Sequence, residues 1–210
     1  ILATGGISHP ETGSTGDGFT FLQRLGHTVR TPSPTLVPLV VSDAWIHNMA
    51  GVTIPNCALT LEKPSGTDKD TRITTRGSVL CTHVGISGPP VINISTDVSD
   101  VLPYTDVVLR LNLFPEYSVE KISAMILEHI ESMPSSYLFN VLRKIMHAHL
   151  ADHILTTFSL TRDMQSLTLP KAKRFEIARY LKGIPIHVER LLGSDKAIVT
   201  RGGVPLSEIH

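Results

Sequence analysis

The 210-residue sequence has little cysteine, few aromatic residues and no excess of charge of either sign. Two cysteines, Cys57 and Cys81, are too few for a secreted disulfide framework, so we expect a reduced, cytoplasmic protein. The 19 basic and 19 acidic residues balance, which predicts no nucleic-acid partner. No apolar run reaches the roughly 20 residues that cross a bilayer, so no membrane partner is predicted either.

Both ends of the sequence have the pattern expected where a chain is cut within a secondary-structure element. There is no initiator methionine, and Ile1 to Thr4 has the apolar character of the end of a buried strand. We therefore expect a central fragment of a longer protein. A chain of 210 residues is long enough for one large domain or several smaller ones, and we expect two or three subregions.

Glycine and small hydroxyl residues gather in the opening stretch, Ile1 to Gly18. Glycine lets the backbone approach a ligand closely, and the N-terminus of a helix attracts anions. The stretch has neither the Gly-Lys-Ser/Thr of a P-loop nor the Gly-x-Gly-x-x-Gly of a dinucleotide fold. Two interpretations stay open: an anion site, or a tight turn before a helix from Asp17 to Leu25 with Asp17 as its N-cap.

Apolar residues at alternating positions predict short strands of an antiparallel sheet or small barrel in the middle of the chain. The polar segment Pro64 to Asp70 predicts a solvated hairpin loop, and Arg76-Gly77 a second turn. The predicted strands are His27 to Arg30, an extended segment Thr31 to Val41, then Ala58 to Leu61, Ile73 to Thr75, Val79 to Thr82 and Val107 to Leu113.

A helical periodicity replaces the alternation after Pro115. It predicts helices at Ser118 to Ser132, Tyr137 to Leu150 and Lys171 to Lys182, the first capped by Ser118. Strands resume at Ile184 to Leu192 and Ala197 to Thr200. The helical block is therefore predicted to be an insertion within the β unit.

A second glycine loop, Thr82 to Pro89, runs into a predicted helix, because proline suits the first helical turn. His83 could exchange a proton near neutral pH, although a lone histidine is more often a structural hydrogen-bonding group. Ser87 fits a helix cap better than a nucleophile, since no Gly-x-Ser-x-Gly surrounds it. The histidines at 147, 149 and 153 lack a nearby cysteine, so we predict no metal site.

Several short motifs occur in a fixed order and together resemble one family, the aminoacetone-oxidase-like, BaiN-like NAD(P)/FAD-dependent oxidoreductases. The resemblance covers essentially the whole chain. The motifs are Ala3-Thr4-Gly5-Gly6, Gly13-Ser14-Thr15-Gly16-Asp17-Gly18, Leu25-Gly26-His27, Leu36-Val37-Pro38-Leu39, Thr82-His83-Val84-Gly85-Ile86-Ser87-Gly88-Pro89 and Gly202-Gly203-Val204.

The resemblance implies an α+β flavoprotein with three kinds of domain. Parts of a Rossmann-like FAD domain form both ends, around an inserted antiparallel β-barrel-like domain and a nested helical subdomain. The implied boundaries are 1–35 and 197–210 for the FAD domain, 36–114 and 184–196 for the β domain, and 115–183 for the helical subdomain.

The resemblance also implies which residues face the cofactor and the substrate. Thr82, His83, Gly85, Ser87 and Gly88 would face the flavin or the substrate cleft, and His83 is the one candidate catalytic residue. The residues implied to bind the cofactor are Thr4, Gly5, Gly6, Ser14, Thr15, Gly16, Asp17, Gly202, Gly203 and Val204.

The leading hypothesis is the central portion of a FAD-dependent oxidoreductase that transfers hydride through the flavin to or from a small-molecule substrate. FAD is the expected cofactor of the intact protein, and NAD(P)H is the candidate reductant. This portion alone is expected to be inactive, because it lacks the glycine-rich fingerprint and the C-terminal Gly-Glu segment of the family. The alternative is a stand-alone binding or interaction module that no longer binds flavin. The sequence indicates neither the substrate nor the oligomeric state.

Overall fold

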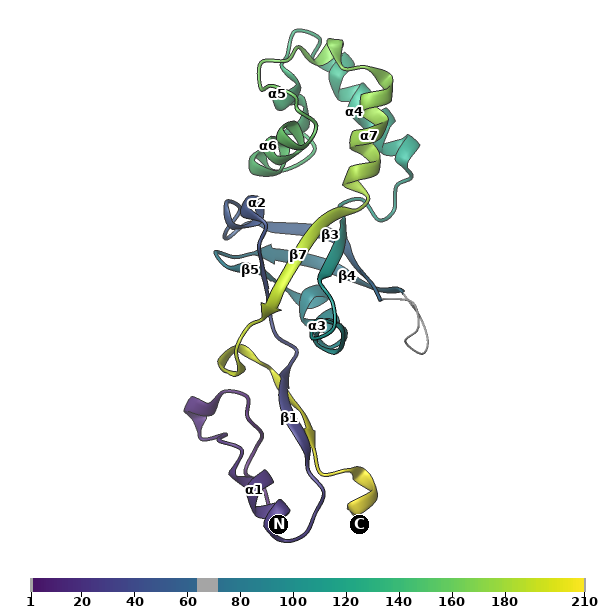
Figure 1. Ribbon diagram of the computed structural model, residues 1–210. Coiled ribbons are helices and arrows are strands. Elements are labelled where there is room, and N and C mark those ends of the chain that lie inside the picture. The colour runs from purple at the N-terminus through teal and green to yellow at the C-terminus, as the bar shows by residue number, and fades with distance from the viewer. Residues whose placement is uncertain (1, 64–71, 210) are drawn as a thin grey trace.

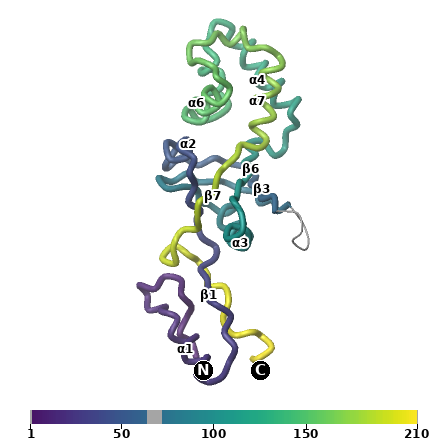
Figure 2. The backbone as a smooth tube through the Cα atoms, viewed as in Figure 1, coloured from purple at the N-terminus to yellow at the C-terminus, as the bar shows by residue number. Residues whose placement is uncertain are grey.

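The computed structural model describes residues 2–63 and 72–209. The chain is elongated, with a β-barrel between a helical group at one end and a thin ribbon near both chain ends at the other (Figures 1 and 2). The predicted α+β class, with an antiparallel barrel and a helical part, is confirmed. The predicted loop Pro64 to Asp70 lies outside the described residues. Within the described part, no helix is both long and apolar enough to cross a membrane.

Six antiparallel strands close the barrel in the order β2-β5-β4-β3-β6-β7. The predicted alternation is clear in β6, where inward residues are buried and their neighbours are more exposed. The single-turn helix α2 (Ala44–His47) and the longer helix α3 (Pro89–Val101) connect barrel strands. The strands are β2 (Leu39–Val41), β3 (Thr53–Glu62), β4 (Arg72–Cys81), β5 (Gly85–Ser87), β6 (Val107–Asn112) and β7 (Ile184–Leu191).

The helical group is inserted between β6 and β7. Its two ends are tied together, because the Leu113 amide donates to the Leu181 carbonyl at 3.0 Å and the Lys182 ammonium donates to the carbonyl of Phe114 at 2.9 Å. Ser118 caps the first helix as predicted, accepting from the Lys121 amide at 3.2 Å. The helices are α4 (Val119–Ser132), α5 (Leu138–Leu142), α6 (Ala148–Thr157) and α7 (Lys171–Leu181), with a 3-10 turn at Ser166–Thr168.

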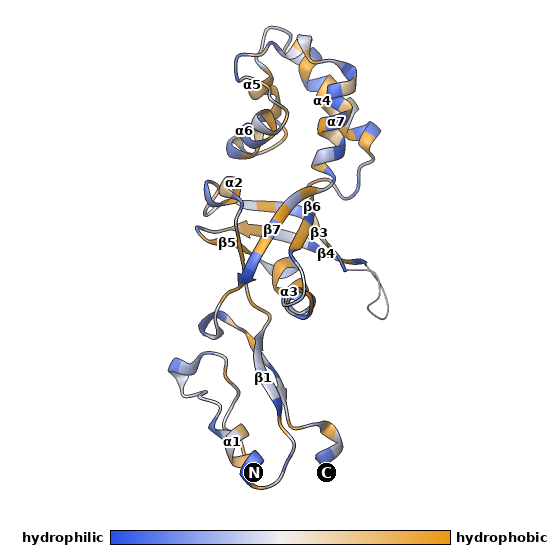
Figure 3. Cartoon of the chain, in the orientation of Figure 1, coloured by the Kyte–Doolittle hydropathy of each residue, from blue (hydrophilic) through white to orange (hydrophobic). Residues whose placement is uncertain are grey.

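The thin end consists of a two-stranded antiparallel ribbon, β1 (Arg30–Thr35) with β8 (Val199–Gly203), and the helix α1 (Asp17–Arg24). Figure 3 shows mostly neutral or polar colouring along this ribbon and more apolar colouring on the barrel strands and α3. Single 3-10 turns lie at Pro10–Thr12, Ser194–Lys196 and Leu206–Glu208.

Three local predictions were wrong. The predicted helix Tyr137 to Leu150 is two helices, because His147 has an extended backbone and starts α6. The predicted turn at Arg76-Gly77 lies inside β4, where Gly77 faces a bulge of β3 and leaves room for Pro90. The strand predicted at His27 to Arg30 begins only at Arg30, since His27 is tied to α1 and to Glu208.

Two elements of the described barrel, α2 and β5, had no sequence prediction. The helix α2 is a single turn, and β5 is only three residues long, so neither has enough length for a periodicity. Both depend on packing against other barrel elements. The strand β5 joins β2 to β4 and is therefore needed for closure.

The two cysteines are buried in the barrel and carry free thiols. Burial raises the pKa of the Cys81 thiol from 9.0 to about 11 and also raises that of Cys57. Both thiols therefore stay protonated at pH 8, and thiolate is the reactive form. We expect almost no reaction of the native protein with a thiol reagent at pH 8, and two reacting thiols in denaturant. Rapid labelling of native protein would contradict this burial.

A stacked aromatic cluster joins the helical group to the barrel. The Trp45 ring of α2 stacks on His153 of α6, with ring centroids 4.8 Å apart. The His153 Nε2 lies 2.8 Å from the hydroxyl of Tyr180 on α7. Burial lowers the pKa of His153, partly opposed by the nearby charge of Asp43. The folded protein therefore favours the neutral imidazole.

Acid is expected to weaken this cluster. The pKa of His153 lies below its ordinary value of 6.5 in the folded state, so stability is complete above pH 6.5 and falls as the pH drops through the folded-state pKa. Urea unfolding at pH 7 and pH 5 should show a smaller loss in His153→Phe than in the unchanged protein. His149→Phe, an exposed position on the same helix, is the matched control. Equal pH dependence in His153→Phe and the unchanged protein would refute this role.

Candidate functional site

The residues assigned to the cofactor come together at the thin end of the molecule. The opening stretch folds back on α1 and β8, so closely that a Cβ at Gly6 would lie 2.2 Å from the Thr200 hydroxyl. A Cβ at Gly5 would lie 2.9 Å from the Ser14 hydroxyl, and one at Gly203 would lie 3.0 Å from the Phe19 ring. The three glycine segments that are far apart in the sequence are thus neighbours.

Thr200 on β8 holds the opening stretch in place. Its hydroxyl accepts from the Ile7 amide at 2.8 Å and the Ser8 amide at 3.2 Å. It also lies 3.1 Å from the Ser8 hydroxyl. A second tie, from the His9 amide to the Ser194 carbonyl at 3.1 Å, fixes the next part of the stretch. The sequence did not single out Thr200, because its partners lie near the other end of the chain.

The N-terminus of α1 differs from the prediction in one detail. Gly16, with a φ of 85°, is the N-cap in place of Asp17, which is the first helical residue. The Asp17 carboxylate accepts from the Thr15 hydroxyl at 2.9 Å and caps no backbone amide in this helix. Left-handed backbone at the N-cap favours glycine and explains the correction.

A hollow of about 460 Å³ lies between the ribbon and the C-terminal end of α3. Gly202, Gly203 and Val204 line it, whereas the opening stretch and the start of α1 do not. Arg201 borders it and donates to Asp100 of α3 at 2.6 Å. Asp100 also lines the hollow and neutralises Arg201, so the positive charge there is that of Arg30. Of the predicted cofactor set, Gly202, Gly203 and Val204 therefore face this hollow.

The second predicted loop lies in the barrel, away from these segments. Thr82 and Gly85 form a tight turn, with the Thr82 amide donating to the Gly85 carbonyl at 2.7 Å. A Cβ at Gly88 would lie 2.4 Å from the Ser78 carbonyl oxygen, so this glycine allows close packing. Ser87 belongs to β5 and Gly88 is the N-cap of α3, so the helix cap predicted at Ser87 is wrong. His83 is exposed. Across residues 2–63 and 72–209, no hydrogen bond or ion pair joins this loop to the glycine segments at the thin end.

Two of the three clustered histidines have structural partners. His147 accepts from the His149 amide at 3.4 Å, and His153 belongs to the Trp45 cluster. Among the described residues, no group of three metal-ligand side chains comes together.

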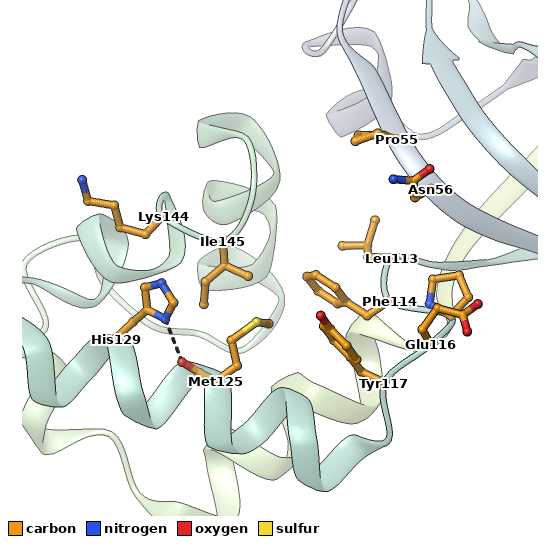
Figure 4. A pocket seen from close by; sticks show the side chains of 11 residues that line it. Pro55, Asn56, Leu113, Phe114, Glu116, Tyr117, Met125, His129, Lys144 and Ile145 are labelled. Atoms are coloured by element: carbon orange, nitrogen blue, oxygen red, sulfur yellow. Dashed lines mark hydrogen bonds between the residues drawn. The ribbon is translucent and has the colours of Figure 1, made fainter.

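A cleft between the barrel and the helical group had no sequence prediction (Figure 4). It has a volume of about 480 Å³ and opens where β3 bulges at Pro55 and Asn56. Asn56 has a φ of 50°, which the bulge requires. The opposite wall comes from α4 and from the connection between α5 and α6. In the sequence, the signal for this cleft is the aromatic pair Phe114 and Tyr117. Their rings are stacked, with centroids 6.2 Å apart.

The packing of the glycines and the exposure of their neighbours decide whether a dinucleotide cofactor fits the thin end. Every predicted cofactor glycine would place a Cβ within 3.0 Å of protein atoms, so these glycines bring segments together. Thr4, Thr15 and Asp17 remain exposed, as does Gly202 at the hollow. The exposed hydroxyls and backbone fit one wall of a cofactor site.

Comparisons with known proteins match most of the chain. Residues 33–199 match a family model described as the HI0933-like protein barrel and H2TH domain. The whole chain is 26% identical to half of a 3-dehydro-bile acid delta(4,6)-reductase from Clostridium scindens, with 100% of this chain and 50% of the relative covered. It is also 26% identical to a ribosomal RNA dihydrouridine synthase from Haemophilus influenzae, over 97% of this chain and 47% of that protein. A ribosomal RNA dihydrouridine synthase from Escherichia coli is 32% identical over 46% of this chain and 22% of the relative. The chain thus spans about half the length of the first two relatives.

Proposed function

The chain belongs to the HI0933-like family of flavoprotein oxidoreductases, and from this membership we propose that the protein reduces a carbon–carbon double bond with FAD as its cofactor. The family match over residues 33–199 carries the proposal, because it includes the complete barrel and the complete helical group. The glycine segments at the thin end lie outside that match, but the reductase relative covers them.

The names of the relatives suggest the type of reaction. One acts on the delta(4,6) bonds of a 3-dehydro bile acid, and the others form dihydrouridine in ribosomal RNA. The substrates are unrelated, but each name describes the addition of hydrogen across a carbon–carbon double bond. We extend this reaction to the present protein and leave the identity of its substrate to experiment.

FAD, when bound, carries hydride between a reductant and the substrate. The described residues would hold it in two ways. The start of α1 offers helical amides, which favour negative charge, whereas the Thr15 hydroxyl donates to Asp17 and can only accept from the cofactor. Arg30 adds positive charge at the hollow that Gly202 lines, where Arg201 is paired with Asp100. These groups position the cofactor and require no acid or base of their own.

Absorbance and reduction under anaerobic conditions test the proposal. The purified intact protein should be yellow, release FAD on denaturation and lose its flavin colour on addition of NADH or NADPH. A 3-dehydro-Δ4,6 bile acid and a uridine-containing RNA should then be offered separately, and the product should gain two hydrogen atoms by mass. A colourless protein that takes up no FAD would refute the cofactor assignment. A flavoprotein that reduces neither substrate would refute the extension of the relatives' reaction to these two molecules.

A second candidate is a binding module that no longer holds flavin. It is favoured by the close packing at the predicted cofactor glycines. A Cβ added at each of them would lie within 3.0 Å of other protein atoms, which leaves no room there for a ligand. Calorimetric titration with FAD separates the two candidates, because only a flavoprotein should release or absorb heat. A matched titration with a nucleoside phosphate shows whether any heat is specific to the flavin.

A further inference from the structure

We propose that the cleft between the barrel and the helical group binds a small monocarboxylic acid with a narrow apolar body, such as a medium-chain alkanoate. The apolar part enters an enclosed inner lobe of the cleft, and the carboxylate stays at the open mouth near Lys144. The site is separate from the glycine segments at the thin end, so the inference does not rest on the proposed cofactor or reaction.

The cleft consists of two adjoining lobes. The outer lobe is the volume of about 480 Å³ shown in Figure 4, and the inner lobe is more enclosed and measures about 140 Å³. In Figure 4, the Phe114 ring projects from the barrel side toward Ile145 on the helical side. A narrow ligand can therefore occupy both lobes at once. The residues that line both lobes mark the passage between them: Pro55, Leu113, Phe114 and Ile145.

The inner lobe has a mainly apolar lining that comes from both sides of the cleft. Met49, Val52 and Ile54 belong to the barrel, and Met146 and Leu150 belong to the helical group. All five belong to the hydrophobic core or pack against it. A cavity of about 150 Å³ lined by aliphatic and aromatic side chains stays dry and accepts a six-carbon ring such as benzene. The inner lobe therefore suits an apolar group of about six carbons and is too small for a fused-ring system.

The charges at the mouth favour a carboxylate over an amine. Glu116 is the one carboxylate among the described residues that line the two lobes, and it is paired with the Arg76 guanidinium at 2.5 Å. Lys144 forms no ion pair with a carboxylate anywhere in residues 2–63 and 72–209. Figure 4 shows its long side chain at the margin of the cleft, where it is free to turn toward a ligand. The unpaired charge at the mouth is therefore positive.

The two histidines of the cleft add no negative charge. The His129 Nδ1 lies 2.9 Å from the Met125 carbonyl and must donate to it, so Nε2 is an acceptor in the neutral ring (Figure 4). His147 lines the inner lobe and has the opposite arrangement. Its Nδ1 accepts from the His149 amide at 3.4 Å, so Nε2 carries the proton of the neutral ring. His147 thus adds a donor that suits a carboxylate.

Calorimetric titration with octanoate tests the inference. Hexanoate is two methylenes shorter, and each buried methylene contributes a factor of about four, so hexanoate should bind about 15-fold more weakly. Octanol and octylamine have the same chain and test the head group. Octanoate should bind more tightly than octanol, and octylamine should bind least tightly of the three. Lys144→Gln should weaken octanoate binding by about two- to fivefold and leave octanol binding unchanged.

Ile145→Phe should fill the passage between the lobes and weaken octanoate binding by about 15-fold or more, because the new ring displaces at least two methylenes. Its melting temperature should not fall, since the ring occupies a cavity. Leu167→Phe is the matched control, because it adds the same ring at a position of the helical group that is 61% exposed. It should bind octanoate as the unchanged protein does. Val52→Phe fills the inner lobe from the barrel side and repeats the test if Ile145→Phe is unstable.

Three results would each overturn the proposal: no binding of octanoate, equal octanoate affinity in Ile145→Phe and Leu167→Phe, or tighter binding of octylamine than of octanoate. Cholate that binds more tightly than octanoate and is lost in Ile145→Phe would make the cleft a site for a fused-ring molecule and would also overturn it. None of these measurements follows flavin absorbance or reduction. Failure of this proposal and failure of the FAD assignment are therefore distinguishable.

Discussion

Replacing Gly85 with alanine is expected to destabilise the barrel by about 3 kcal/mol or more, a large fraction of the stability of a typical domain. The new Cβ would lie 2.1 Å from the Leu39 carbonyl oxygen and 2.9 Å from the Val40 Cα. Both atoms belong to the backbone of β2, so no side chain can move aside. Because β2 pairs with both β5 and β7, its displacement opens the barrel. Urea unfolding followed by Trp45 fluorescence measures the loss.

Gly183→Ala is the matched control for this substitution. Gly183 follows α7, and a Cβ there would meet no atom within 4 Å. The free energy of unfolding of Gly183→Ala should differ from that of the unchanged protein by no more than about 0.5 kcal/mol. If Gly85→Ala proved as stable as Gly183→Ala, the close approach of β5 to β2 would be incorrect.

Thr200→Val is expected to release the opening stretch from β8 and to weaken FAD binding by about 30- to 150-fold. The substitution keeps the shape of the side chain and removes the hydroxyl that binds the Ile7 amide, the Ser8 amide and the Ser8 hydroxyl. At about 1 kcal/mol for each hydrogen bond, the removal of two or three of them corresponds to that factor. Titration with FAD measures the effect on the proposed cofactor.

Thr200→Ser restores the hydroxyl and should bind FAD nearly as well as the unchanged protein. Limited proteolysis gives a readout that does not depend on the flavin, because a released opening stretch should be cut faster in Thr200→Val than in Thr200→Ser. Equal cleavage and equal FAD affinity in the two variants would show that Thr200 does not hold this stretch.

Local chemistry made parts of the fold predictable. A serine cap and an apolar stripe placed α4 within one residue of its start, and prolines in the first turn placed α3. The switch between two periodicities located the helical insertion within the β unit. In each case the deciding interactions lie within one element or its immediate neighbours, so the sequence alone contains them.

Long-range interactions explain what the sequence could not predict. Gly85 and Gly88 had the pattern of a ligand loop, but their lack of a Cβ accommodates backbone from β2 and β4. The cleft at Asn56 requires a bulge in β3 and a helical group from much later in the chain, and no local pattern encodes that meeting. For the cofactor segments, the order of motifs suggested a shared role, whereas their hydrogen bonds through Thr200 depend on the folded chain.

The hydrogen bond from the Leu113 amide to the Leu181 carbonyl holds the two ends of the helical group side by side. The insertion leaves and re-enters the barrel at adjacent points, so a short turn could replace it without altering the order of the strands. Relatives could therefore exchange or enlarge the helical group by recombination while keeping an inherited barrel. Such exchange would let one ancestral scaffold serve chemically unrelated molecules.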